Sequence, residues 1–143
     1  MDEIDESIID LVERGVVRYT TLAKKLGMPL STIHLRMKKL EKSGAIRYYK
    51  GEIDWKKAGF PLTAFVLISV DISLLKSLKR TQEQILKELL EIMYVREGHI
   101  TTGEADILVK IIARDSSHLR EILLDYIDAK EGIVKTNTMI ILG

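Results

Sequence analysis

The first third of the chain places its hydrophobic residues at the three- and four-residue spacing of helices. Residues 2–13 form one such stretch, and residues 19–26 form a second that ends before Gly27. A third stretch lies between Pro29 and Gly44, where the apolar positions are Leu30, Ile33, Met37 and Leu40. We expect three helices around one small core, with Gly44 ending the third helix in the left-handed conformation.

The tight turn between the second and third predicted helices is typical of a helix-turn-helix, whose second helix enters the major groove of DNA. The outer positions of that helix carry small polar and basic side chains. Its early residues are the candidate contacts to base edges, namely Ser31, Thr32, His34 and Leu35. For Leu35, packing into the core is the alternative. Pro29 cannot act as a side-chain cap, so we expect the helix to start late, with Ser31 as its cap.

Charge favours a nucleic-acid partner for this segment. The whole chain has 22 basic and 21 acidic residues, yet residues 14–50 hold ten basic residues and one acidic residue, a net charge of +9. From Pro61 onward, ten basic residues stand against twelve acidic ones. We expect phosphate contacts from the basic segment, at Tyr19, Thr20, Thr21, Arg36, Lys38, Lys39 and Arg47. A structural role is the alternative for Arg36, and a solvated charged face is the alternative for the segment.

The chain between the two halves changes its pattern twice. Residues 45–53 alternate apolar and polar side chains, which predicts a short strand or hairpin and makes residues 1–53 a winged helix-turn-helix domain. Residues 54–61 begin at an aspartate and contain a glycine and a proline, so we interpret them as a linker. Residues 62–143 then form the second domain.

The second domain repeats an order of strand and helix patterns. Strands rich in β-branched residues are predicted over residues 62–72, 94–102, 106–114 and 133–142. One helix is expected to start between Ser73 and Thr81, where Thr81 and Gln84 fit a capping box, and another to follow a cap at Ser116 or Ser117. The order βαββαβ predicts a ferredoxin-like sandwich, so the fold class is α+β. The strands are apolar on both faces, so we expect a second copy to cover the face without helices.

Composition excludes several kinds of protein. The chain has no cysteine, and its three histidines lie on separate predicted elements, so no set of metal ligands emerges. No apolar run reaches membrane-spanning length, and the acidic N-terminus is unlike a signal peptide. We therefore expect a cytoplasmic protein with no membrane partner, no metal and no cofactor.

These features resemble the Lrp/AsnC family of feast/famine transcriptional regulators over essentially the whole chain. The motifs that carry the resemblance are Met1–Asp5, Leu22–Ala23, Arg36–Glu41, Gly44–Ile46, Gly103–Asp106 and Val134–Thr138. The resemblance implies a regulator that binds double-stranded promoter DNA as a homodimer, often assembled into an octamer, and senses a free amino acid. The chain departs from the family pattern at Val16, Ala105 and Ile107.

The resemblance also places the effector at the turn around Gly103. It implicates His99, Thr101, Thr102, Gly103, Glu104, Asp106, Thr136 and Thr138. Asp106 can accept hydrogen bonds from the ammonium group of an amino acid, while the turn amides near Gly103 can receive its carboxylate. The neutral hydroxyl groups favour a polar uncharged effector such as glutamine or asparagine, and an effector with a cationic side chain, received by Glu104, is the alternative. A β-turn in which Asp106 binds backbone amides is the alternative.

An enzyme on the same scaffold is the second hypothesis, because some tetrapyrrole decarboxylases resemble this two-part architecture. The candidates for such a pocket are Arg96, His99 and Arg114. The basic helix-turn-helix would then have no role, which favours the regulator. We therefore predict no catalytic residues.

Overall fold

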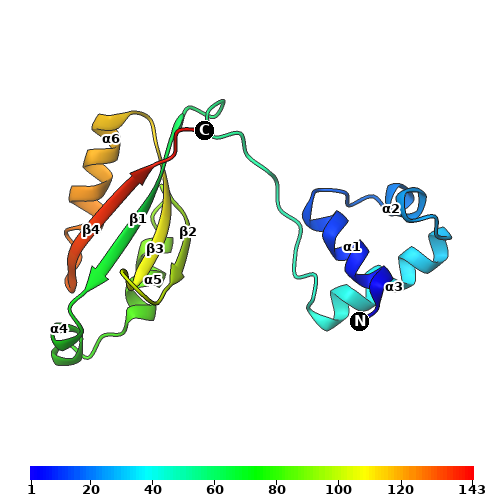
Figure 1. The fold of residues 1–143 in the computed structure, drawn as a ribbon, viewed down its shortest axis with the longest axis horizontal. Helices are drawn as coiled ribbons and strands as arrows, with labels where there is room; N and C mark the ends of the chain where they lie inside the picture. The colour runs from blue at the N-terminus through cyan, green and yellow to red at the C-terminus, as the bar shows by residue number, and fades with distance from the viewer. The chain divides into compact units, whose positions relative to one another are not determined.

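The three helices predicted for the N-terminal part are present in the computed structural model, which describes all of residues 1–143 (Figure 1). Helix α1 spans Glu3–Glu13, α2 spans Tyr19–Leu26 and α3 spans Leu30–Ser43. Gly27 and Gly44 end α2 and α3 in the left-handed conformation, with φ of 62° and 83°. The helices share a core made of Ile8, Leu22, Ile33, Met37, Leu40 and Ile46.

The start of α3 differs from the prediction, and the assignment of Ser31 as its cap was wrong. Pro29 occupies the N-cap position with φ −61° and ψ 144°, and the helix begins at Leu30. The Pro29 carbonyl accepts hydrogen bonds from the backbone amides of Thr32 and Ile33. An N-cap residue needs an extended backbone and a free carbonyl, and proline supplies both although its side chain cannot accept a bond.

The strand predicted over residues 45–53 is not formed. Ile46 is buried and its amide bonds to the Leu40 carbonyl, but no other strand of the chain pairs with this segment. The alternation of buried and exposed residues that a strand would show is therefore limited to Ile46, which is buried, because Tyr48 and Tyr49 are both exposed. A single extended segment cannot form a ladder without a partner.

The chain divides into two units, Met1–Gly51 and Glu52–Gly143. We call the first unit the head. The predicted linker, residues 54–61, contains a turn in which the Asp54 carboxylate accepts from the Lys57 amide at 3.1 Å. Trp55 and Phe60 pack their rings edge to face within this turn, and the Phe60 ring also contacts Tyr94 of the second unit. The turn therefore belongs to the second unit and packs against the rest of it.

The second unit is built on one antiparallel sheet, as predicted. Its strands are β1 (Leu62–Val70), β2 (Val95–Ile100), β3 (Ile107–Ala113) and β4 (Ile133–Ile140). They lie in the order β2-β3-β1-β4, which Figure 1 shows from its right to its left within this unit. With the helices between them, this is the βαββαβ order of the ferredoxin-like fold.

The helices of the second unit begin at aspartate and threonine caps. Thr81 and Gln84 form the predicted capping box before α5 (Gln82–Leu90), and α4 (Ile72–Ser77) precedes it with Asp71 as its cap. The predicted caps Ser116 and Ser117 were wrong. The carboxylate of Asp115 accepts from the His118 amide at 2.7 Å, which starts α6 (Ser116–Glu121) one residue earlier. A π-helical turn, η1 (Ile122–Ile127), continues α6.

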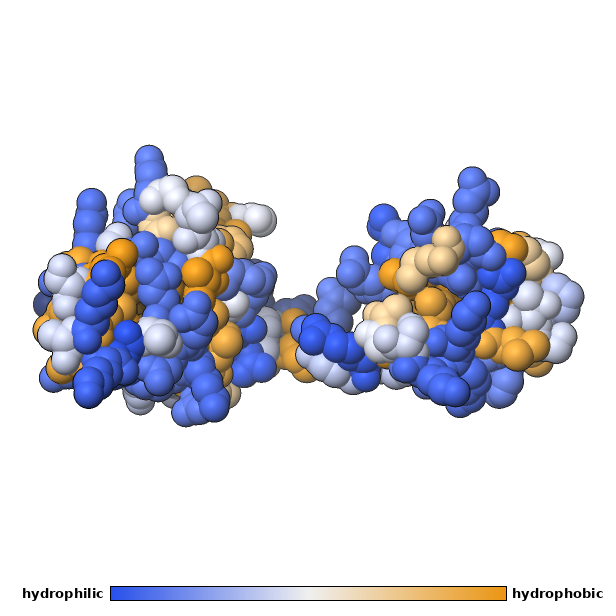
Figure 2. Space-filling view, turned by 90° about the horizontal axis from the view of Figure 1, so that it is seen from below, coloured by the Kyte–Doolittle hydropathy of each residue, from blue (hydrophilic) through white to orange (hydrophobic).

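One face of the sheet is covered by helices and the other is open. The covered face packs Val66 and Ile111 of the strands against Ile85, Leu89 and Ile122 of the helices. Alternate residues point the other way, so the open face carries Thr63, Phe65, Leu67, Leu108 and Met139, with Lys110, Lys135 and Asn137 among them, while Ile112 on the same side is buried. Figure 2 shows hydrophobic side chains reaching the surface of both units between hydrophilic ones.

Candidate nucleic-acid interface and effector site

The outer face of α3 carries the side chains predicted to meet DNA. Exposed residues follow one another along it, namely Ser31, His34, Leu35, Lys38, Lys39 and Lys42, while Thr32 is half-buried. Leu35 is 72% exposed, so the alternative of core packing for this residue was wrong. An exposed leucine among lysines provides an apolar side chain on a charged surface. Such a side chain can contact the methyl group of thymine in the major groove.

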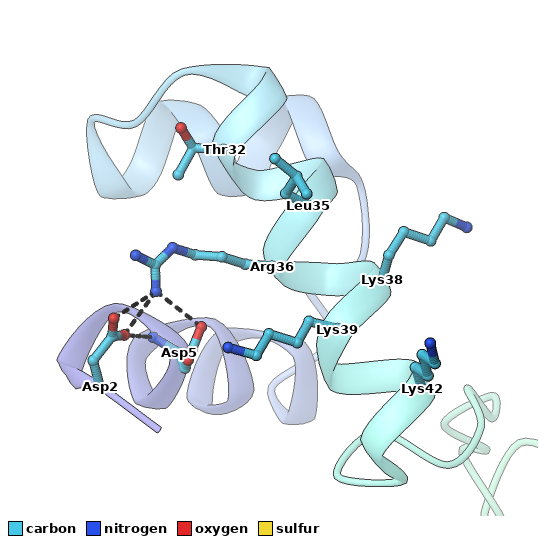
Figure 3. Close-up of a pocket in the computed structure, with 8 residues that line it drawn as sticks. All are labelled: Asp2, Asp5, Thr32, Leu35, Arg36, Lys38, Lys39 and Lys42. Carbon is cyan, nitrogen blue, oxygen red and sulfur yellow. Dashed lines mark hydrogen bonds and ion pairs between the residues drawn. The ribbon is translucent and has the colours of Figure 1, made fainter.

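A groove lies between α1 and α3, and Figure 3 shows Arg36 extending across it toward α1. Its Nη1 donates to both carboxylate oxygens of Asp2, at 2.8 and 2.7 Å, and to Oδ1 of Asp5 at 3.1 Å. The Arg36 side chain is 27% exposed, and Asp5 is buried. The hydrogen bond from Arg36 is the main cause that lowers the pKa of Asp2 to about 2, and both aspartates raise the pKa of Arg36. This matches the structural role considered for Arg36.

Glu41 is the one acidic residue among residues 14–50, and two tyrosine hydroxyls donate to it. The Tyr19 hydroxyl lies 3.1 Å from Oε1, and the Tyr49 hydroxyl lies 3.5 Å from the same oxygen. Burial raises the pKa of Tyr19, and the bond to Glu41 adds to the effect. The Tyr19 ring also packs edge to face on His34. This role of Glu41 was not predicted from the sequence, although its position as the one acidic residue of a basic segment was a signal.

The remaining predicted phosphate contacts of the head lie at its surface or close to it. Thr20 and Arg47 are exposed, and Thr21 is half-buried. The Arg47 guanidinium lies 5.9 Å from the centre of the Tyr48 ring, in the segment that follows α3. Arginine paired with an exposed aromatic ring keeps its donors in water, where a phosphate oxygen can reach them.

Residues 101–106, which we call the effector turn, form a closed loop between β2 and β3. The Thr101 amide donates to the Asp106 carbonyl at 2.9 Å, and its hydroxyl donates to the Ala105 carbonyl at 2.9 Å. The Asp106 carboxylate accepts from the Val70 amide at 2.9 Å. This last bond is the backbone contact considered as the alternative role of Asp106, and it occupies one of the two carboxylate oxygens.

The other predicted effector residues fall on two faces of the sheet. Thr102, Gly103 and Glu104 are exposed at the tip of the effector turn. Ile68 of β1 pairs with Ile107 of β3 on one side and with Thr136 of β4 on the other. Thr136 therefore lies at the end of the sheet that carries the effector turn, two strands away from it. Its side chain is on the covered face, as is that of Thr138. His99 pairs with Leu108 on the open face and contacts the Glu97 carboxylate at 2.9 Å.

The three residues considered for catalysis have separate partners. The Arg96 guanidinium lies 4.9 Å from the centre of the Trp55 ring. The Arg114 guanidinium lies over Phe60 and Tyr94, at 5.3 and 5.7 Å from the ring centres. His99 pairs with Glu97, as described above. Each side chain thus has a local structural partner.

Comparison with known proteins assigns both units. A family model described as "Lrp/AsnC ligand binding domain" matches residues 63–143, which is more than half of the chain. The chain belongs to the Lrp/AsnC family. A second model, described as "winged helix-turn-helix DNA-binding", matches residues 1–47. The Lrp/AsnC chain is therefore a DNA-binding transcriptional regulator with a ligand-binding domain.

Relatives and solved structures agree with this assignment to the Lrp/AsnC family. The HTH-type transcriptional regulator FL11 of Pyrococcus furiosus is 32% identical over 143 residues, which cover 99% of this chain and 89% of that protein. The structure of E. coli AsnC has a TM-score of 0.79 and 26% identity, and the match covers 100% of this chain and 93% of that one. A Neisseria meningitidis regulator, solved in complex with L-Met, has a TM-score of 0.85 at 22% identity, covering 100% and 90%.

FL11 and the Neisseria meningitidis protein are named as transcriptional regulators, which supports a regulator over an enzyme. None of the helices in this Lrp/AsnC chain has the length and apolar character needed to cross a bilayer.

Proposed function

We propose that this Lrp/AsnC protein is a sequence-specific regulator that reads DNA through the outer face of α3. The observation that carries the proposal is the exposure of Leu35, which is 72% exposed and lies between Ser31 and Lys38 on α3. The opposite side of α3 packs into the hydrophobic core of the head. Lysines beside it supply sequence-independent attraction to phosphates, while Ser31, Thr32, His34 and Leu35 supply contacts to base edges.

The test is fluorescence anisotropy with a duplex selected by the protein from a random-sequence library. We expect two half-sites about one helical turn apart, or a multiple of it, and a logarithmic slope of affinity against salt of roughly −5, for about six neutralised phosphates. Replacing Lys38 and Lys39 with glutamine should reduce this slope and weaken all sequences alike. Substitutions of Thr32 and His34 should change the selected sequence. An affinity that does not depend on salt would contradict the proposal.

We propose further that the second unit binds a free amino acid at the effector turn. The tip of the turn presents exposed amide groups and Glu104, and Asp106 keeps one carboxylate oxygen outside its bond to Val70. A zwitterion needs this pairing of donors and an acceptor. The Neisseria meningitidis regulator, which shares the fold, was solved with L-Met, so a fold of this kind accommodates an amino acid. The neutral threonines favour a polar uncharged amino acid such as glutamine for this chain.

We propose finally that the protein assembles through the open face of the sheet into homodimers, which associate further into octamers. Phe65, Leu67 and Leu108 lie side by side on that face, and in the single chain they are half-buried. An apolar sheet face of this kind is stable when a second copy covers it. Binding of an amino acid between dimers would then change the spacing of the heads on DNA, with a coupling free energy of about 1–3 kcal/mol.

A further inference from the structure

Arg36 and the two aspartates form a polar clamp between helices that are far apart in the sequence. Asp2 is the N-cap of α1, Asp5 belongs to its first turn, and Arg36 lies in the middle of α3. The three bonds of the clamp all use Nη1 of Arg36. Figure 3 shows Lys38 and Lys42 extending away from α1, whereas Arg36 turns toward it. Lys39 also extends toward α1 in Figure 3, so what sets Arg36 apart from the other cations of α3 is its ion pairs with Asp2 and Asp5.

The clamp is fixed at its α1 end as well. Oδ1 of Asp2 accepts from the Asp5 amide at 2.9 Å, so the carboxylate that receives Arg36 also caps the helix. Asp5 is 7% exposed, and a carboxylate at that depth requires a charged or hydrogen-bonded partner, which Arg36 provides. The Asp2 carboxylate is thus held by the backbone of α1 as well as by Arg36, and the Asp5 carboxylate is held by Arg36.

The position of Arg36 on α3 makes the clamp sensitive to rotation of that helix. Ile33, Met37 and Leu40 form the buried row, and Arg36 borders it on the side that faces α1. An apolar row alone permits small rotations, because its contacts are not directional. Rotating a helix by about 20° moves a side chain at its surface, roughly 5–6 Å from the axis, by about 2 Å. Such a movement is enough to lose a hydrogen bond to a base edge.

We propose that Arg36 is a positioning residue of the DNA interface: through Asp2 and Asp5 it fixes the rotation of α3, and it makes no phosphate contact itself. The inference rests on the proposed sequence-specific binding. It replaces the expectation of a phosphate contact at Arg36. It also gives the acidic start of α1 a role in DNA recognition, although carboxylates cannot bind phosphates.

This inference is tested by whether Asp2→Asn strengthens or weakens binding to the selected duplex. Asparagine caps a helix as well as aspartate does, so the variant removes the charge and keeps the cap. If Arg36 contacted phosphate, removing a competing carboxylate would strengthen DNA binding. The clamp instead predicts roughly tenfold weaker binding to the selected duplex, comparable to one lost base contact, with unchanged binding to random duplex. Tighter binding of Asp2→Asn to both duplexes overturns the inference.

Asp10→Asn is the matched control. Asp10 also lies on α1 and pairs with an arginine, Arg14, but this pair is exposed and lies within the helix. The variant has the same change in net charge and leaves α3 untouched. We expect it to bind the selected duplex as tightly as wild type or slightly more tightly. If Asp10→Asn weakens binding to the selected duplex as much as Asp2→Asn does, the effect comes from the change in net charge and not from the clamp, and the inference fails.

Arg36→Gln and Lys38→Gln separate positioning from phosphate contact. The clamp predicts that Arg36→Gln loses discrimination between the two duplexes while its salt slope stays at the wild-type value. Lys38→Gln should reduce the slope by about 1 per chain. Combining Arg36→Gln with Asp2→Asn should add no further loss. A lower slope for Arg36→Gln overturns the inference, and if that variant fails to fold by circular dichroism, Asp2→Asn decides alone. A wild-type protein that selects no duplex refutes the proposed function itself.

Discussion

The carboxylate of Asp106 can serve the fold and a ligand at the same time, because it has two oxygens. Oδ2 accepts from the Val70 amide and ties the end of the effector turn to β1. The ammonium group of an amino acid would require the negative charge as well as a free oxygen. The two roles can therefore be separated by removing the charge and keeping the acceptor.

Asp106→Asn should abolish the thermal shift that the effector produces and leave the protein nearly as stable as wild type. Asparagine retains an oxygen for the Val70 amide but cannot pair with an ammonium group. Asp106→Ala should lose the shift and also destabilise the unit by about 1–3 kcal/mol, because the amide is left without its partner. Differential scanning fluorimetry with the twenty amino acids measures both effects. An unchanged shift in Asp106→Asn would show that Asp106 is a turn residue only.

The sequence predicted most of the outward-facing side chains of α3, but Leu30, expected in the buried row, is 49% exposed, and the differences among the cations were not predicted. The spacing of Ile33, Met37 and Leu40 determines the buried row, and Leu35 is exposed because it lies opposite that row. A structural role was one of the two predicted for Arg36, but its partners were not predicted. Its partners, Asp2 and Asp5, lie 34 and 31 residues earlier in the chain, and a local pattern cannot report a contact at that separation.

At the scale of helices and strands, local chemistry predicted the elements better than their ends. The capping box of Thr81 and Gln84 was correct because both partners lie within one turn. Asp115 capped α6 in place of the predicted serines, since an aspartate one residue earlier accepts the same amide. The strand expected over residues 45–53 was wrong, because pairing depends on a partner that the local sequence does not contain.

Gly132 is required where the chain enters β4, and its replacement should be costly. Its φ is 96°, and a Cβ atom there would lie 2.5 Å from Cδ2 of Leu75. Gly132→Ala should lower the free energy of unfolding by about 3 kcal/mol, from backbone strain and overpacking together. Gly59→Ala is the control, because φ is 100° but the space is open, so about 1 kcal/mol is expected. Urea denaturation measures both. Equal losses would show that Leu75 moves aside freely.

At the scale of the whole molecule, the open face of the sheet should determine the oligomeric state. Leu67→Arg places a charge in the middle of that face and should give a monomer in sedimentation velocity, because a buried unpaired charge is costly. Leu124→Arg is the control, since Leu124 is 50% exposed in η1 on the helical side. It should sediment as wild type does. A Leu67→Arg protein of unchanged mass would place the interface elsewhere.

The separate hydrophobic cores of the two units have a consequence for how such a protein evolves. Ile33 and Met37 support α3 from within the head, while Ile68 and Ile107 support the effector turn from within the sheet. Substitutions at distant sites with no shared partners act additively on stability. Selection can therefore retune operator choice and ligand choice one at a time, which gives duplicated copies of such a gene two independent routes to divergence.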